Sequence, residues 1–293
     1  MTSPESGRQN QEAARSNVIF NLVLMVAKLV VGIVGQSQAL IADGLHSGAD
    51  VLSSIAVVIG LAVAGRPPDS GHHYGHAKAE AISQKVVAVF LLLAGLEVAN
   101  SAIQGLTHPG ARPSWLTFWV AVAAMVPKVF MAASQRRLAK RTGSHGILAS
   151  AVDNQMDAVS SFVAALGIAA THVGFRSGDS LAALIVAVLV MWAGVEVFRT
   201  AASDLMDPAA DAETEAGIRR IAAGCSGVRR IAALRTRMSG TEVRVDLEIE
   251  VDRQLSLVAA HEIAHAVEDA VMDLDRVRGV TVHVNPAQED DMA

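Results

Sequence analysis

The sequence has little charge and almost no cysteine. Only 18% of its 293 residues are charged, whereas a soluble domain carries about 25%. The single cysteine, Cys225, excludes a disulfide framework and a cysteine-rich zinc module. The formal net charge of −5 argues against a nucleic-acid partner, because nucleic-acid-binding domains are usually basic. No nucleophile–base constellation or phosphate-binding glycine loop stands in the sequence, so we expect no enzyme.

The shortage of charge is confined to the first two-thirds of the chain. Six stretches there have the roughly 20 mostly apolar residues that a membrane-spanning helix needs. The first follows Arg15 and is interrupted by Lys28, which favours a retained helix over a cleaved signal peptide. We therefore expect a polar tail over 1–14 and a six-helix membrane domain over 15–206. The predicted spans are 17–34, 40–64, 82–103, 115–133, 147–173 and 181–198.

The basic residues between the spans indicate an orientation. One side carries Arg8, Arg15, Arg66, Lys78 and four basic residues within 136–141, and the other side carries only Arg112 and Arg176. The positive-inside rule then places both termini in the cytoplasm.

The last third of the chain reads as a small α+β domain. Strand 241–251 alternates apolar and charged residues, as a half-buried strand does. Helices are expected over 212–223 and 257–272, and strands over 228–238, 241–251 and 277–284. The order α-β-β-α-β predicts a ferredoxin-like, metallochaperone-like domain over 207–287, with its helices on one sheet face and a polar tail over 288–293.

Two pairs of ionisable side chains lie inside the apolar stretches. His46 and Asp50 stand four residues apart in the second stretch, as do Asp153 and Asp157 in the fifth. A helical turn holds about 3.6 residues, so each pair shares one helix face. Ionisable groups at membrane depth are costly and usually face a partner, a cavity or an ion. Since the two spans run in opposite directions, we expect the four side chains to hold one divalent ion.

The ligand types leave the identity of that ion open. Three neighbouring carboxylates repel unless a cation or protons neutralise them. Four ligands match tetrahedral zinc, whereas an oxygen-rich set suits manganese or ferrous iron. In the alternative, each acidic residue is a buried polar group whose hydrogen bonds are satisfied by neighbours in its helix. That alternative could explain a single acidic residue, but it explains two i,i+4 pairs on separate spans less well. Asp43 is expected on the route of the ion or in a hydrogen bond. Ser47 and Asn154 are near enough in sequence to support the ligands, but we favour ordinary helix packing for both.

A histidine cluster follows the second span. The segment 67–80, PPDSGHHYGHAKAE, contains Asp69, His72, His73 and His76 within eight positions. Histidine and carboxylate side chains in a short tract indicate metal binding. A solvated loop with chance histidines explains the composition equally well, so both alternatives stay open.

Together these motifs resemble the cation diffusion facilitator family. They are HSGAD in the second span, HYGHAKAE in the next loop, DNQMD in the fifth span and the C-terminal α+β domain, and their order also matches. The resemblance implies a homodimer that exports divalent metal from the cytoplasm across a bacterial inner (plasma) membrane in exchange for protons. It implies zinc, iron or manganese as substrate, with cobalt, nickel and cadmium as further candidates.

The resemblance also implies particular site residues. They are His46, Asp50, Asp153 and Asp157 for the transport site; Asp69, His72 and His76 for the loop site; Asp246, His261 and His283 for a cytoplasmic-domain site; and Lys78 with Asp207 for an ion bridge joining the two domains.

The sequence departs from the family's zinc pattern in both domains. Asp153 stands where many zinc members have histidine, which shifts the prediction toward manganese or iron. Ala232 and Asn285 stand at two cytoplasmic ligand positions, so we expect a reduced regulatory site, with one metal per set of positions or a metal bridging two subunits. The alternative function is a non-transporting membrane scaffold or metal-sensing partner subunit, which would not need paired carboxylates in lipid.

Overall fold

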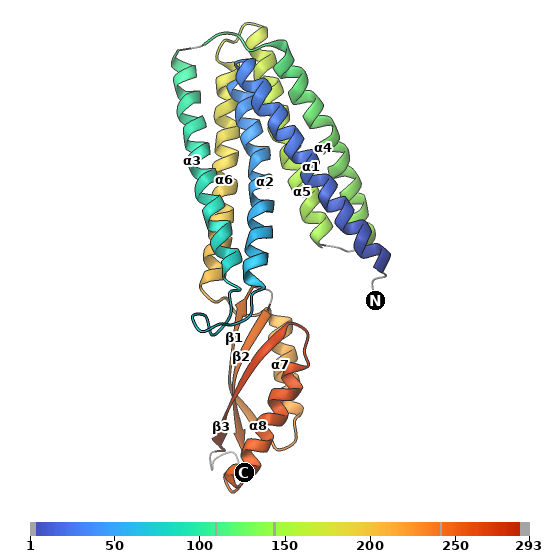
Figure 1. The fold of residues 1–293 in the computed structure, drawn as a ribbon, viewed down its shortest axis with the longest axis vertical. Helices are drawn as coiled ribbons and strands as arrows, with labels where there is room; N and C mark the ends of the chain where they lie inside the picture. The colour runs from blue at the N-terminus through green and yellow to red at the C-terminus, as the bar shows by residue number, and fades with distance from the viewer. Residues whose placement is uncertain (1–3, 109, 143–144, 241, 288–293) are drawn as a thin grey trace. The chain divides into compact units, whose positions relative to one another are not determined.

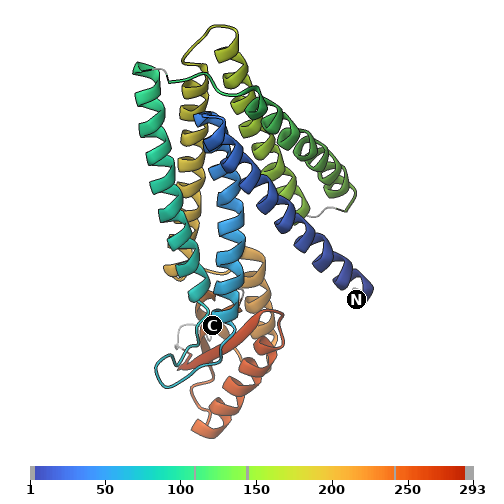
Figure 2. The same ribbon diagram turned by 45° about the horizontal axis from the view of Figure 1, so that its top comes forward.

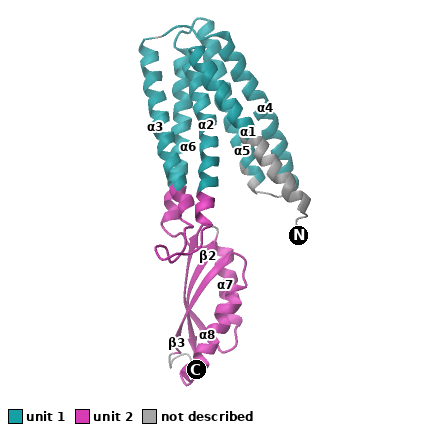
Figure 3. Ribbon diagram, in the orientation of Figure 1, with its two compact units in different colours: residues 1–59, 83–199 teal, residues 60–82, 200–293 magenta. Residues whose placement is uncertain are grey.

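The computed structural model divides into two compact units, each with its own core. It describes residues 4–108, 110–142, 145–240 and 242–287. One unit comprises residues 1–59 and 83–199, and the other comprises 60–82 and 200–293 (Figure 3). The expected tail over 288–293 lies outside the described residues.

Six long helices occupy the positions of the six predicted spans (Figure 1). They are α1 (Pro4–Val34), α2 (Gln38–Ala64), α3 (Ala79–Thr107), α4 (Trp115–Thr142), α5 (His145–His172) and α6 (Gly178–Leu205). The first begins at Pro4, well before the expected residue 17. α2, α3, α4 and α6 each contain a stretch long and apolar enough to cross a membrane, and α1 has a shorter apolar run over Ile19–Val34.

Small side chains let these helices approach closely. A Cβ added at Gly167 of α5 would lie 2.2 Å from the Cβ of Ala182 in α6, so this contact requires glycine. Such small-residue packing is a usual way for helices to associate in lipid. Large apolar side chains such as Phe90 and Phe130 are exposed on the outside. One core cluster consists of Ala39, Ala42, Ala102, Ala164, Ala182, Ala183, Val186 and Val190.

α2 and α5 run in opposite directions, as the site prediction requires. Asp43 is hydrogen-bonded to Ser161, and His46 faces Asp157 further along the pair. Residue numbers therefore rise along α2 while they fall along α5. α4 lies beside α5 in both views and also contacts α1 (Figures 1 and 2), so α1 and α4 can contribute side chains to the same region.

The C-terminal domain has the predicted order of elements. They are α7 (Ala212–Gly224), β1 (Arg230–Ser239), β2 (Glu242–Val251), α8 (Leu257–Met272) and β3 (Val277–Pro286). Asp211 and Ser256 cap the two helices, each accepting a hydrogen bond from the backbone N–H three residues on.

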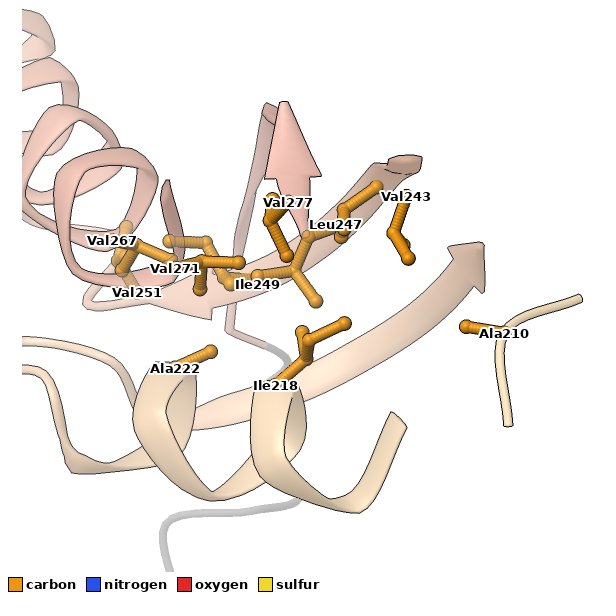
Figure 4. Packing of buried hydrophobic residues seen from close by; sticks show 11 residues of the cluster. Ala210, Ile218, Ala222, Val243, Leu247, Ile249, Val251, Val267, Val271 and Val277 are labelled. Atoms are coloured by element: carbon orange, nitrogen blue, oxygen red, sulfur yellow. The ribbon is translucent and has the colours of Figure 1, made fainter. Parts of the chain in front are cut away.

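The sheet has the strand order β1-β2-β3 and one covered face. β1 and β2 are antiparallel, and β2 and β3 are parallel because α8 crosses between them. Val243 and Leu247 of β2 belong to one core cluster with Ile218 of α7 and Val267 of α8 (Figure 4). The intervening charged residues of β2 therefore lie on the face away from the helices.

Candidate metal centre

His46 of α2 and Asp157 of α5 face each other inside the first unit. His46 Nε2 lies 3.8 Å from Asp157 Oδ1, and the two side chains are 12% and 3% exposed. Asp50, Asp153 and Asp157 line one cavity of about 320 Å³. The two helix faces predicted from the i,i+4 spacing thus oppose each other, and they offer one imidazole and three carboxylates to the same region.

The four side chains are not drawn together into a closed coordination sphere. Asp157 is buried, whereas Asp153 is exposed. Within the described ranges, they do not form a set whose ligand atoms all lie within 4.8 Å of one another. Asp157 Oδ1 and His46 Nδ1 are buried and have no hydrogen-bond partner there. A buried acceptor without a donor is costly, and a cation would satisfy Asp157 Oδ1.

A buried lysine that the spacing of the motifs does not identify contacts this site. Lys128 of α4 places its Nζ 2.5 Å from Asp157 Oδ2 and 2.8 Å from Asn21 Oδ1 of α1. Its side chain is 4% exposed. The sequence does show a basic residue inside the fourth apolar stretch. A lysine at membrane depth needs an acceptor, so its position alone indicates a buried partner.

A second buried lysine explains the role of Asp43. Lys28 Nζ lies 2.9 Å from Asp43 Oδ2 and donates to the hydroxyls of Ser47 and Ser161 at 2.9 and 3.0 Å. The Ser161 hydroxyl donates to the same Asp43 oxygen at 2.8 Å. The geometry thus supports the hydrogen-bonding alternative for Asp43. Asn154 bonds to side-chain and backbone oxygens of α4 and α5, which agrees with a packing role.

The loop between α2 and α3 brings its predicted ligands together. His72 Nδ1 lies 3.3 Å from Asp69 Oδ1, and His76 Nε2 lies 3.4 Å from Asp69 Oδ2. The three residues offer ligand atoms that all lie within 4.8 Å of one another. Backbone N–H groups of Gly71 and His72 donate to Asp69 and hold the pKa of its carboxyl below the usual value. The carboxylate is therefore kept in the charged form that binds metal.

Lys78 and Asp207 form the predicted ion pair within the second unit. Lys78 Nζ lies 2.9 Å from Asp207 Oδ1. Asp207 follows the end of α6 with a positive φ of 54°. Nearby, the guanidinium groups of Arg237 and Arg244 lie 5.1 and 5.2 Å from the ring centre of Tyr74.

The three residues expected for the cytoplasmic-domain site do not meet within one chain. Asp246 is paired in register with Thr281, and His283 with Glu248, on the sheet face away from the helices. His261 lies on α8, on the other side of the sheet, and its Nε2 is 3.2 Å from that of His265. A site that uses all three residues is thus a prediction for two subunits together.

Comparison with known proteins covers nearly the whole chain. Residues 15–206 match the cation efflux transmembrane domain, and residues 210–287 match the cytoplasmic domain of cation efflux proteins. The manganese efflux system protein MneP of Bacillus subtilis is 30% identical over 289 residues, which are 96% of this chain and 97% of MneP. The magnetosome protein MamM of Magnetospirillum gryphiswaldense is 35% identical over 253 residues, which are 85% of this chain and 79% of MamM.

One solved structure, a variant of MamM-CTD, is 30% identical and covers 26% of this chain and 96% of its own, with a TM-score of 0.26. The family matches confirm the resemblance inferred from the motifs, and they identify a class of transporters and not of enzymes. The chain belongs to the cation efflux, or cation diffusion facilitator, family and is a multi-pass membrane transporter of divalent metal cations.

Proposed function

We propose that the protein exports Mn²⁺ by alternating access, with the ion held by four side chains between α2 and α5. These are His46, Asp50, Asp153 and Asp157. The observation that carries the proposal is the opposed pair of His46 and Asp157 beside a cavity lined by all three aspartates. A lipid-embedded bundle gains nothing from three neighbouring carboxylates unless a cation or protons neutralise them.

The choice of manganese rests on ligand chemistry and on relatives. Three carboxylates and one imidazole form an oxygen-rich set, which suits Mn²⁺ and Fe²⁺ better than the softer ligands typical of zinc sites. Two relatives, MneP and MneS of Bacillus subtilis, are named as manganese efflux proteins. Zinc and iron are the competing substrates.

Protons are the proposed counter-ions. Carboxylate and imidazole ligands must be deprotonated to bind metal, so metal and protons compete for the same atoms. When the metal leaves, protons can relieve the repulsion among the aspartates. Exchange of metal for protons therefore needs no second ion site.

The other predicted features fit the same transporter. Asp69, His72 and His76 are proposed to bind a further ion in the loop between α2 and α3. The chain is proposed to work as a homodimer through its cytoplasmic domain. Both termini are proposed to lie in the cytoplasm, and the protein is proposed to lie in the inner membrane of a bacterium.

Transport by purified protein in proteoliposomes tests the proposal. His46→Ala and Asp157→Ala should each abolish Mn²⁺ uptake, because each removes a buried ligand. His73→Ala is the matched control and should transport normally, since His73 lies outside the predicted sites. Near-wild-type uptake by either site variant would refute the site assignment, and metal binding without uptake in the wild type would favour the scaffold function.

A further inference from the structure

The two lysines that are buried in the described part of the first unit have different partners. Lys28 is satisfied by Asp43, Ser47 and Ser161, none of which is a proposed ligand. Lys128 instead forms an ion pair with Asp157, one of the four proposed ligands. The contacts of Lys28 are thus outside the proposed site and stabilise helix packing. Lys128 lies where a metal ion would compete with it for Asp157.

The two oxygens of Asp157 have different surroundings. Oδ2 accepts the Lys128 ammonium at 2.5 Å. Oδ1 faces His46 Nε2 at 3.8 Å and has no hydrogen-bond partner within the described part of the chain. One oxygen of the carboxylate is therefore occupied by a cation that belongs to the protein, and the other is free toward the remaining ligands.

The lysine and a metal ion would share one small space. Lys128 lines the same cavity as Asp50, Asp153 and Asp157. Without a cation, three carboxylates would stand together in a membrane-spanning unit, and like charges at short range disfavour their ionised forms. The ammonium brings their formal sum from −3 to −2. A divalent ion beside the ammonium would instead be repelled by it.

The second acceptor of Lys128 allows the ammonium to leave Asp157. Asn21 Oδ1 accepts from Nζ at 2.8 Å and comes from α1, which contributes no residue to the proposed site. Lysine has a flexible stem and three donors that can reorient. A short movement can therefore exchange Asp157 for another acceptor while Asn21 still holds the ammonium.

We propose that Lys128 is an exchangeable internal cation of the transport site: its ammonium neutralises Asp157 when the site is empty, and incoming metal displaces it. This inference rests on the proposed function. Lys128 contacts a ligand but not the metal, so it is a positioning residue. By competing with metal, it weakens binding and speeds release.

The test is metal affinity and transport of full-length Lys128→Met, a variant that keeps the apolar stem and removes the charge. Its Mn²⁺ dissociation constant should fall about tenfold, within the usual range for coupled ligands. In proteoliposomes both KM and the maximal rate should fall, because a more tightly held ion is released more slowly. Loss of a merely structural contact would weaken binding or leave it unchanged.

Three variants separate the possible causes. Lys85→Met removes a lysine of the same unit that lies 5.4 Å from the Phe198 ring centre, and it should leave affinity unchanged. Lys128→Arg keeps the charge and should restore weaker binding. Lys128→Gln removes the charge but can still donate a hydrogen bond to Asn21, and it should also bind Mn²⁺ more tightly. It replaces Lys128→Met as the test if the methionine variant does not fold.

Variants made in the Asp157→Asn protein separate a failure of the proposed role of Lys128 from a failure of the proposed transport site. There, Lys128→Met should not restore Mn²⁺ binding, since the carboxylate for which the two cations compete is gone. Unchanged or weaker Mn²⁺ binding by a folded Lys128→Met or Lys128→Gln protein would overturn the role of Lys128. If Asp157→Asn alone left binding intact, the proposed transport site would fail, and the role of Lys128 with it.

Discussion

Lys28 and Lys128, which are buried in the helical unit, each form an ion pair with a carboxylate. Lys28 is 1% exposed and its partner Asp43 is fully buried. Two serine hydroxyls add hydrogen bonds to Lys28 and to Asp43 Oδ2, whereas Asp43 Oδ1 has no hydrogen-bond partner among the described residues. Removing one partner of a buried ion pair leaves the other charge uncompensated, which costs about 3–5 kcal/mol in soluble proteins.

Lys28→Met should therefore destabilise the protein strongly, because Asp43 would lose its counter-charge. Thermal unfolding in detergent measures the effect, and the midpoint should fall by several degrees. The double variant Lys28→Met/Asp43→Leu removes both charges and should recover part of the loss. A single variant as stable as the wild type would show that the ion pair contributes little.

For the candidate transport site, side-chain spacing predicted the four proposed ligands but could not predict the contact between Lys128 and Asp157. His46 with Asp50, and Asp153 with Asp157, share helix faces by virtue of their i,i+4 spacing, so sequence alone places each pair. Lys128 lies on α4, and nothing in its spacing identifies Asp157 as its partner. That partnership depends on how helices pack, which spacing within one helix does not encode.

At the scale of elements, the carboxylate of Asp69 holds the loop between α2 and α3 in its turn through hydrogen bonds. Asp69 accepts hydrogen bonds from two backbone N–H groups, and these fix it beside His72 and His76. The side chains of Asp69 and His72 are about half exposed or more, so the cluster is open to ions from solution. Composition left a solvated loop equally possible, and the geometry of the turn adds that the three side chains lie close together.

Asp69→Asn should remove one Mn²⁺ or Zn²⁺ equivalent from the protein, because it replaces the carboxylate shared by both histidines. Calorimetric titration of full-length protein counts the bound ions. His73→Ala is the control and should keep the wild-type number, since His73 is outside the cluster. An unchanged stoichiometry in Asp69→Asn would rule out the loop site.

The contact between α5 and α6 gives a second prediction for elements. A Cβ at Gly167 would clash with Ala182 at 2.2 Å, so Gly167→Ala should destabilise by about 1–3 kcal/mol through overpacking. Gly217→Ala in α7 meets no atom within 4 Å and should stabilise by roughly 0.5–1 kcal/mol. Thermal unfolding compares the stability of the two variants. Equal changes in stability would contradict the close approach of α5 and α6 at Gly167.

At the scale of the whole molecule, sequence pattern predicted the elements of both units. The alternation of Val243, Val245, Leu247 and Ile249 gave β2 and its buried face, and helix α8 runs over the predicted residues. The site on Asp246, His261 and His283 could not be judged from sequence, because the sheet separates His261 from the other two in one chain. Whether such a site exists depends on a second subunit.

The whole account depends on one divalent ion bound between α2 and α5. Anomalous diffraction from crystals of the Asp69→Asn protein soaked in Zn²⁺ can locate that ion without interference from the loop. We predict one peak about 2.0–2.2 Å from ligand atoms of His46, Asp50, Asp153 and Asp157, with Lys128 Nζ moved away from Asp157. A structure with metal bound elsewhere, and no peak between these two helices, would contradict it.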